Sequence, residues 1–159
     1  MKKHPLYTIG HGNRKAEELL DLLKRHEIDY LVDVRSMPFS KFNPQFNKPV
    51  LTDFLKANQI RYVYLGDLLG GKPKKKECYQ ENGLPNYEKI KEQDFFLKGI
   101  ERLKNAYEKN LRLAFMCSET NPSECHRSRL ITPVLLKEGV IVKHIDEEGN
   151  LRDQEWGLF

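Results

Sequence analysis

Short apolar runs that alternate with helical patterns constrain the fold of this chain more than any other feature. Between the runs, apolar residues recur at intervals of three and four, as on the buried face of a helix. The runs are Leu6–Ile9, Tyr30–Val34, Tyr62–Leu65, Leu111–Met116 and Val140–Ile145. The near-continuous apolar character of such runs is typical of parallel strands that are covered on both faces. The alternation therefore predicts an α/β fold with a mainly parallel five-stranded sheet between two layers of helices.

Helix signals fill the intervals between these strands, and polar loops follow the second and third strands. The tail is expected to form a turn or hairpin around Glu148–Asn150, with Trp156 returning to the body. The expected helices are Arg14–His26 with Asn13 as its cap, Pro49–Asn58, a long helix from a cap at Asn86 to about Lys109, and a helix that ends at Gly139.

Composition indicates a globular protein rather than a membrane or disulfide-rich one. A chain of 159 residues is expected to form a single domain over residues 1–159. No apolar run approaches the roughly 20 residues that span a membrane, and the start of the chain lacks the apolar segment of a signal peptide. Three cysteines are an odd count without a disulfide framework, which favours a reducing cytoplasm. The net charge of +4 permits a phosphate-bearing partner without requiring one.

Chemically capable residues follow three of the predicted strands. Ligands in parallel sheets bind beyond the carboxyl ends of the strands, where the strand order reverses. These segments are therefore expected to share one rim of the sheet. They are Gly10–Arg14, Arg35–Ser36 and Cys117–Glu119.

The densest of these segments continues to Arg127 and holds two thiols. Asn121, Pro122 and Glu124 resemble a capping box at the start of a helix. Free N–H groups there, together with His126 and Arg127, favour an anion site. The same positive environment would lower the pKa of Cys117 or Cys125 and make it a better nucleophile. A cysteine that ends a buried strand can equally be a small apolar residue.

The other two strand ends leave alternatives open. Gly10-His11-Gly12 resembles the start of a dinucleotide fingerprint, but Lys15 stands in place of the third glycine. His11 is a functional group or a helix cap, and Arg14 contacts phosphate or lies on a solvated helix surface. Asp33 lies inside an apolar strand, so it needs a partner such as Arg35, His11 or a backbone donor. It is then either part of a structural ion pair or a general base. Arg35 and Ser36 suit anion binding through a bidentate guanidinium.

Metal and nucleic-acid binding are further alternatives. Cys117, Cys125 and His126 with Glu119 or His11 could ligate iron or zinc. The paired C-x-x-C spacing is missing, however, and adjacent helical residues point about 100° apart, so we assign no metal ligands. The basic run Lys72–Lys76 is a solvated loop or attracts a polyanion. The nearby aromatic residues cover the core or stack on bases, and they are Phe39, Phe42, Phe46, Tyr62, Tyr64 and Tyr79.

Several motifs follow one another along the chain. They are Thr8–His11 with Arg14, Asp33–Ser40, Leu65-Gly66 with Gly70-Gly71, Met116–Glu119 with Pro122, Cys125–Arg127, and His144-Ile145. In this order they resemble the motifs of domain-of-unknown-function family 488. The resemblance runs from about Leu6 to Ile145 and implies a compact Rossmann-like α/β domain with these motifs as its site. The family carries a suggested link to nucleotide or nucleic-acid processing and no firmly assigned activity.

We predict an enzyme that binds a phosphate-bearing substrate, a nucleotide or nucleic acid, at this rim. The alternatives are cysteine-thiolate chemistry of the rhodanese or phosphatase kind, a metal-binding protein, and a non-catalytic nucleic-acid-binding module. The sequence assigns no cofactor and no oligomeric state. The catalytic candidates are His11, Asp33, Cys117, Glu119 and His126. The substrate-binding candidates are Gly10, Arg14, Arg35, Ser36, Ser118 and Arg127.

Overall fold

The structure is a computed structural model that describes residues 3–154 and contains one six-stranded sheet. Its strands are β1 (Leu6–Gly10), β2 (Tyr30–Asp33), β3 (Arg61–Tyr64), β4 (Leu113–Cys117), β5 (Val142–Ile145) and β6 (Leu151–Arg152). They lie in the order β3-β2-β4-β1-β5-β6, with the first five mutually parallel and β6 antiparallel to β5.

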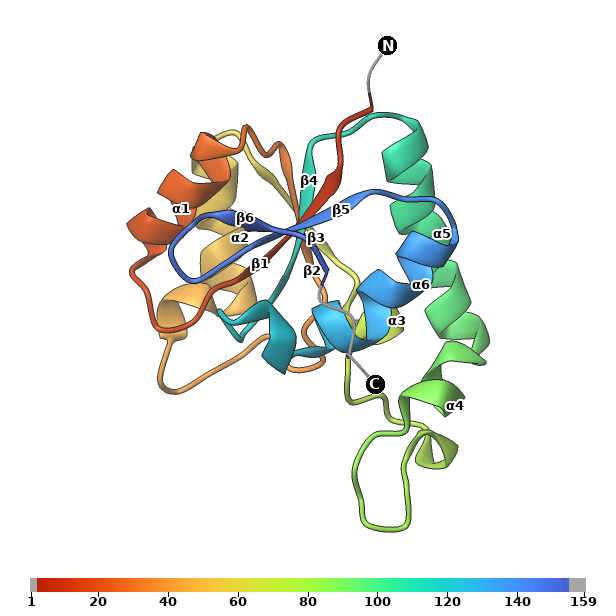
Figure 1. Ribbon diagram of the computed structural model, residues 1–159. Coiled ribbons are helices and arrows are strands. Elements are labelled where there is room, and N and C mark those ends of the chain that lie inside the picture. The colour runs from red at the N-terminus through yellow and green to blue at the C-terminus, as the bar shows by residue number, and fades with distance from the viewer. Residues whose placement is uncertain (1–2, 155–159) are drawn as a thin grey trace.

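Helices cover both faces of the sheet, as expected for parallel strands that are joined by helical crossovers. Helices α1 and α2 lie on one face, and α5 and α6 lie on the other (Figure 1). The helices are α1 (Ala16–Arg25), α2 (Lys48–Ala57), α3 (Gly66–Leu69), α4 (Tyr87–Lys91), α5 (Asp94–Glu108) and α6 (Thr132–Lys137). Within the described chain, no helix combines the length and the apolar character that crossing a bilayer requires.

The two faces of β4 show how the alternation of side chains builds two cores. Ala114 and Met116 belong to the core beneath α1 and α2. Phe115 and Cys117 point the other way, into the core beneath α5 and α6. Cys125 belongs to that same second core. The alternation of side chains along β4 therefore points Cys117 toward the core that also contains Cys125.

The sheet has six strands, so the prediction of five was one strand short. The sixth strand comes from the hairpin that the sequence predicts around Glu148–Asn150. The Asp146 carboxylate accepts hydrogen bonds from the backbone N–H groups of Glu148 and Asn150, both at 2.9 Å. Gly149 has the positive φ of 87° that the turn requires. The tight turn brings Leu151 and Arg152 back beside β5. Trp156 lies outside the described residues.

Two helices differ from the predicted bounds for local reasons. Helix α1 begins at Ala16 rather than Arg14, because the Lys15 N–H donates to the Glu18 carboxylate at 2.8 Å. Asn86 does cap a helix, as predicted, but that helix ends at Lys91 and α5 begins afresh at Asp94. Gln93 interrupts them in an extended conformation. Its buried side chain donates to the Lys89 carbonyl at 3.0 Å.

The segment after β4 does not form the helix predicted from Asn121. It makes a single 3₁₀ turn, Pro122–Glu124, and is then extended at Cys125, where φ is −136° and ψ is 166°. A π-helical turn follows at Arg127–Ile131 and leads into α6. Pro133 lacks the N–H that an α-helix would need at this point, which favours the wider turn. Cys125 therefore lies outside any helix.

The carboxyl ends of β1, β2 and β4 lie side by side at one edge of the sheet. Gly10 is paired with Cys117 across β1 and β4, and Asp33 is paired with Met116 across β2 and β4. The chain leaves β1 and β2 toward the face of α1 and α2, but it leaves β4 toward the face of α6 (Figure 1). This divergence opens the edge at the point where the strand order reverses.

The close approach of β1 and the loop after β4 predicts that Gly10→Ala destabilises the fold. An added Cβ would lie 1.6 Å from the Glu119 carbonyl oxygen, which is a backbone atom. We expect a loss of about 3 kcal/mol in the free energy of unfolding, measured by urea denaturation.

Gly83→Ala is the control for this variant. No atom lies within 4 Å of its added Cβ, and its φ is +84°, so a loss of about 1 kcal/mol from backbone strain alone is expected. Equal losses for the two variants would contradict the steric explanation.

Candidate functional site

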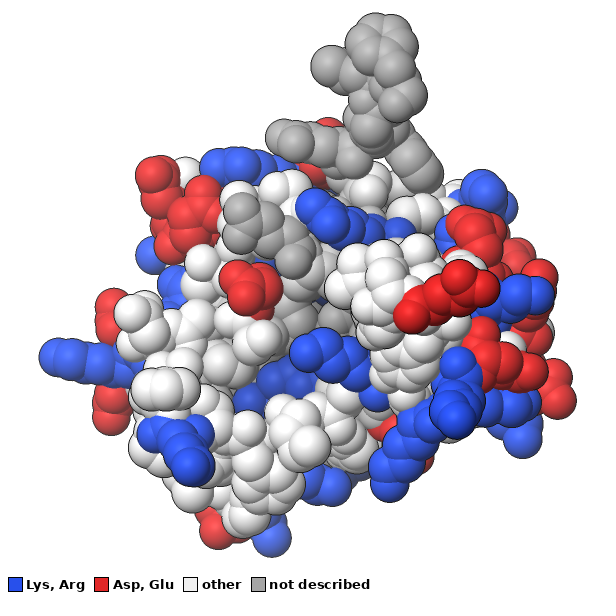
Figure 2. All heavy atoms as spheres, turned by 90° about the horizontal axis from the view of Figure 1, so that it is seen from below, with Lys and Arg blue, Asp and Glu red and all other residues white. Residues whose placement is uncertain are grey.

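An open pocket of about 420 Å³ lies at the carboxyl edge of the sheet. Figure 2 looks at this edge and shows a hollow with Lys or Arg side chains inside and beside it. The pocket is lined by Arg35, Ser36, Met37, Gly71, Lys72, Pro85, Tyr87, Cys117, Ser118, Glu119, Cys125 and His126. Six of the eleven predicted site residues therefore share one cavity: Arg35, Ser36, Cys117, Ser118, Glu119 and His126.

The two cysteines of the motif meet in the wall of this pocket. Their Sγ atoms are 2.6 Å apart, and both residues are buried, with Cys125 8% exposed and Cys117 2%. The extended conformation at Cys125 makes this contact possible, because it carries the chain back toward the end of β4. Arg127 donates from Nε to Cys125 Sγ at 3.2 Å. Cys125 thus accepts a hydrogen bond from a guanidinium and shares a second one with the Cys117 thiol, in which either sulfur can be the donor.

These neighbours determine which sulfur carries the negative charge. Burial raises the pKa of Cys125, but hydrogen bonds from Cys117 and Arg127 and the charge of Arg127 outweigh it, so the pKa falls to about 7. Burial and the S–H bond donated to Cys125 raise the pKa of Cys117 well above its usual value. These neighbours therefore favour loss of the first proton of the pair from Cys125 rather than from Cys117. The sequence singled out both thiols but favoured Cys117 as the catalytic candidate.

Arg127 lies behind the pocket wall and is fully buried. Its other hydrogen bonds go to neutral oxygens: Thr8 Oγ1 at 2.6 Å and the carbonyls of Glu119 and Thr120 at 3.1 and 2.9 Å. Among the described residues, no carboxylate forms an ion pair with it. A buried guanidinium needs a compensating anion. The Cys125 thiolate is the group in contact that can supply this charge.

His126 directly follows Cys125 in the sequence and contributes an imidazole to the pocket. Its Nε2 donates to the Val34 carbonyl at 2.9 Å, which places the proton on Nε2 and leaves a lone pair on Nδ1. Burial, together with the charge of Arg127, lowers the pKa of His126 to about 4. The ring is therefore neutral near pH 7 and can accept a hydrogen bond through Nδ1.

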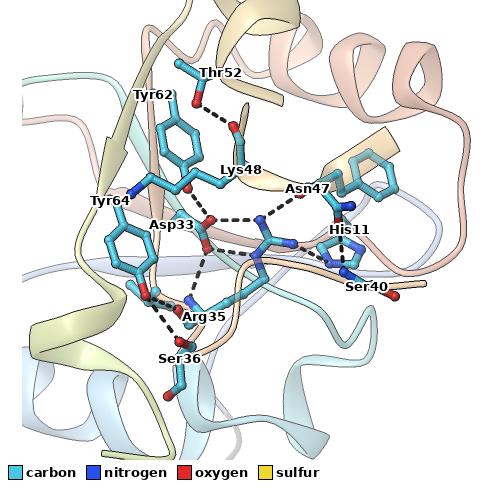
Figure 3. Close-up of polar contacts among 12 residues, drawn as sticks. His11, Asp33, Arg35, Ser36, Ser40, Asn47, Lys48, Thr52, Tyr62 and Tyr64 are labelled. Carbon is cyan, nitrogen blue, oxygen red and sulfur yellow. Dashed lines mark hydrogen bonds and ion pairs between the residues drawn. The ribbon is translucent and has the colours of Figure 1, made fainter. Parts of the chain in front are cut away.

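Asp33 and Arg35 form a buried ion pair immediately behind the pocket (Figure 3). Arg35 donates to the two carboxylate oxygens from Nε at 2.9 Å and from Nη2 at 2.8 Å. Its backbone N–H also donates to Asp33 at 3.1 Å. Tyr62, on β3, donates its hydroxyl to the same carboxylate. The structure thus pairs Asp33 with Arg35, one of the partners that the sequence allowed. The guanidinium of Arg35 therefore makes its bidentate contact with the Asp33 carboxylate.

His11 completes this network, and both of its ring nitrogens are engaged. Nδ1 donates to the Gly12 carbonyl at 2.7 Å, so Nε2 accepts from Arg35 Nη1 at 3.2 Å. The ring also packs on Phe46, with the centroids 4.6 Å apart. Burial lowers the pKa of His11 to about 4. In this arrangement His11 is a neutral group that positions Arg35, and it does not line the pocket.

The remaining predicted residues lie around the pocket in different ways. Ser118 and Glu119 are exposed on its rim. Gly10 lets the Glu119 carbonyl approach the backbone. Arg14 does not line the pocket, and burial lowers its pKa. Its Nε and Nη2 atoms are buried without a hydrogen-bond partner in the described part of the chain.

Tyr62, Tyr64 and Lys72 support the site, although the sequence named none of them as a catalytic or binding candidate. Tyr62 and Tyr64 on β3 hold the loop after β2, since the Tyr64 hydroxyl donates to the Arg35 carbonyl at 3.0 Å. Lys72 was treated only as part of a basic run. Its backbone N–H donates to Ser36 Oγ at 2.9 Å and joins two sides of the pocket. The sequence does contain a signal for Tyr62 and Tyr64, because residues two apart on a strand point to the same face of the sheet.

Among residues 3–154, no group of three or more His, Cys, Asp or Glu side chains is arranged to hold a metal ion.

Comparison with known proteins places the chain in a family. Residues 15–133 match a family described as "Domain of unknown function DUF488". The chain belongs to this family. The matched residues include the segments around Asp33 and from Cys117 to Arg127, but they leave out Gly10, His11 and Arg14. Comparisons with curated proteins and with solved structures gave no match.

The buried ion pair predicts a large loss of stability when one partner is removed. Asp33→Asn leaves the Arg35 charge uncompensated, and we expect the free energy of unfolding to fall by about 3 kcal/mol. Tyr62→Phe removes one hydrogen bond and should cost about 1 kcal/mol. Urea denaturation measures both.

The double variant Asp33→Asn with Arg35→Met is the control, because it removes both charges. We expect it to recover part of the stability that Asp33→Asn loses. A double variant less stable than the sum of its single variants would contradict an ion pair as the cause.

Three histidines predict an acid-sensitive fold. Burial lowers the pKa values of His11, His126 and His144 to about 4 from an ordinary value of 6.5. Between these values the unfolded chain binds protons that the folded chain does not. Stability is therefore complete above pH 6.5 and falls as the pH drops toward 4, by roughly 1 kcal/mol per pH unit for each histidine. Urea denaturation across this range should show a slope that His144→Gln reduces by about one third.

Proposed function

We propose that the protein is a thiol-dependent enzyme that acts on a phosphate-bearing substrate, a nucleotide or a nucleic acid, with Cys125 as its nucleophile. The observation that carries this proposal is the position of Cys125. Cys125 lines an open pocket, and its sulfur accepts a hydrogen bond from Arg127 and contacts the Cys117 sulfur. A thiolate at neutral pH beside a substrate-sized cavity is the arrangement that nucleophilic cysteine enzymes require.

Basic and hydroxyl groups around the pocket support an anionic substrate. Arg35 has five N–H donors, of which four are engaged by Asp33, His11 and the Phe46 carbonyl, so one remains on Nη1. Lys72 is exposed at the rim, and Ser36 and Ser118 add hydroxyl groups. Oxygen atoms of a phosphate group are suitable acceptors for all of these.

The proposal also assigns roles to the neighbouring groups. Neutral His126 can accept a proton or a hydrogen bond through Nδ1. Glu119 contributes an exposed carboxylate on the same rim. His11 and Asp33 act through Arg35 rather than on the substrate. The general acid–base function predicted for them therefore passes to His126 and Glu119 in this proposal.

A second candidate is a non-catalytic module that binds nucleic acid. Large apolar side chains are exposed in the loop between β2 and α2, with Phe42 91% exposed and Phe39 54%. Exposed aromatic rings near lysines are typical of surfaces on which single-stranded bases stack. This candidate needs no reactive thiol, which separates it from the first.

Alkylation of the cysteines tests the proposed enzyme. The rate of Cys125 modification by iodoacetamide, mapped by mass spectrometry, should rise with pH and reach half its maximum near pH 7, where its pKa lies. Cys78 is the internal control, because it is fully buried and its pKa is raised by burial. Equal rates for the two cysteines would contradict an activated thiolate.

Ligand protection tests the substrate class. Nucleotides or short oligonucleotides should slow the alkylation of Cys125, and the effect should weaken at high salt. Lys72→Ala should weaken protection about tenfold or less, since it removes one exposed charge. Lys109→Ala, remote from the pocket lining, is the matched control. The non-catalytic module would be favoured by a different result, in which the ligand binds without changing the alkylation of Cys125 and Phe42→Ala abolishes this binding.

A further inference from the structure

The Cys117–Cys125 contact has a chemical consequence that does not depend on the substrate. The two sulfurs are 2.6 Å apart, which exceeds the length of a disulfide bond by only about 0.6 Å. One cysteine ends a central strand, and the other lies in an extended segment eight residues later. Neither lies inside a helix. A small side-chain movement is therefore enough to join them.

The surroundings of the pair also favour oxidation at one sulfur first. Arg127 Nε donates a hydrogen bond to Cys125 Sγ, which stabilises the thiolate form of this sulfur. Cys125 also has the larger exposed fraction of the two and lines the pocket with its partner. Oxidation of cysteine follows thiolate character and access. Cys125 is thus the sulfur that reacts first with an oxidant. Cys117 lies in position to attack the oxidised Cys125 sulfur.

We propose that Cys117 and Cys125 are a redox-active pair that reduces hydroperoxides and forms a reversible intramolecular disulfide. The Cys125 thiolate attacks the terminal peroxide oxygen, the O–O bond breaks, and the leaving alkoxide or hydroxide takes a proton. Cys125 is then a sulfenic acid. Cys117 attacks its sulfur, the S–O bond breaks, and hydroxide leaves with the proton of Cys117 as water. In sum, a hydroperoxide and two thiols give an alcohol, water and a disulfide.

Arg127 makes the disulfide easy to reduce. In the dithiol state the Cys125 thiolate compensates the buried guanidinium, whose other partners are neutral oxygens. A disulfide has no charge and leaves Arg127 without this anion. Stabilisation of the reduced state raises the oxidising power of a disulfide. A small dithiol should therefore restore the thiols readily and complete a cycle of oxidation and reduction.

This inference shares its nucleophile with the proposed function and is independent of the phosphate-bearing substrate. Oxidation removes the thiolate, so the disulfide form should lack any activity that needs Cys125. Hydroperoxide would then inhibit the enzyme reversibly. Failure to bind phosphate compounds would refute the proposed function and leave the redox pair intact. Failure to form the disulfide would refute the redox pair and leave the proposed function intact.

The experiment uses the full-length reduced protein and hydrogen peroxide at a stoichiometric amount. After quenching with an alkylating agent, the intact mass should show the loss of two hydrogen atoms per chain, with peptides of Cys117 and Cys125 linked. Dithiothreitol should restore both thiols. A stable product with sulfinic acid, with linked chains or with Cys78 in the disulfide would overturn the proposal.

Three variants sharpen the test. In Cys117→Ser, Cys125 should stop at a sulfenic acid, trapped by dimedone, and no disulfide should form. In Cys125→Ser, the rate of peroxide consumption should fall at least tenfold. Cys78→Ala should behave as the unmodified chain does. Because the mass shift is measured on the unmodified chain first, poor folding of any variant leaves the proposal open to refutation.

Discussion

The buried ion pair between Asp33 and Arg35 is the interaction on which the carboxyl edge of the sheet depends. A carboxylate inside an apolar strand is tolerated only with donors around it, and Arg35 and Tyr62 supply them. His11 then joins β1 to this pair through Arg35, and the Phe46 carbonyl adds the loop before α2. One desolvated charge pair thus holds together the loops that follow β1 and β2.

A second buried cation organises the opposite wall. Arg127 binds the loop after β4 through the carbonyls of Glu119 and Thr120 and binds β1 through Thr8. The two arginines differ in their anions, because Arg35 has a carboxylate whereas Arg127 has a thiol that can ionise. A carboxylate partner makes a permanent structural pair. A thiolate partner is reactive and can be oxidised, and this difference between the two arginines is the physical basis of both proposals.

Much of the fold followed from local patterns. Five apolar runs became five parallel strands, and the turn around Glu148–Asn150 formed the predicted hairpin, although its second strand was not counted. Asn86 capped a helix as its side chain predicts. The errors arose where a single side-chain hydrogen bond or a missing backbone N–H overrode the pattern. The buried amide of Gln93 divides the long helix, and Pro133 favours a π-helical turn before α6.

The sequence by itself determined which residues reach the carboxyl edge of the sheet, because parallel strands place their carboxyl ends together and polar residues follow three of the runs. Only the tertiary structure decided how those residues pair. His11 and Asp33 both form hydrogen bonds with Arg35. Cys117 contacts the sulfur of Cys125 and not, as the sequence had suggested, the N-terminus of a helix. These pairings depend on burial and on contacts between segments that are separated along the chain. A pattern read along one strand or one helix does not contain that information.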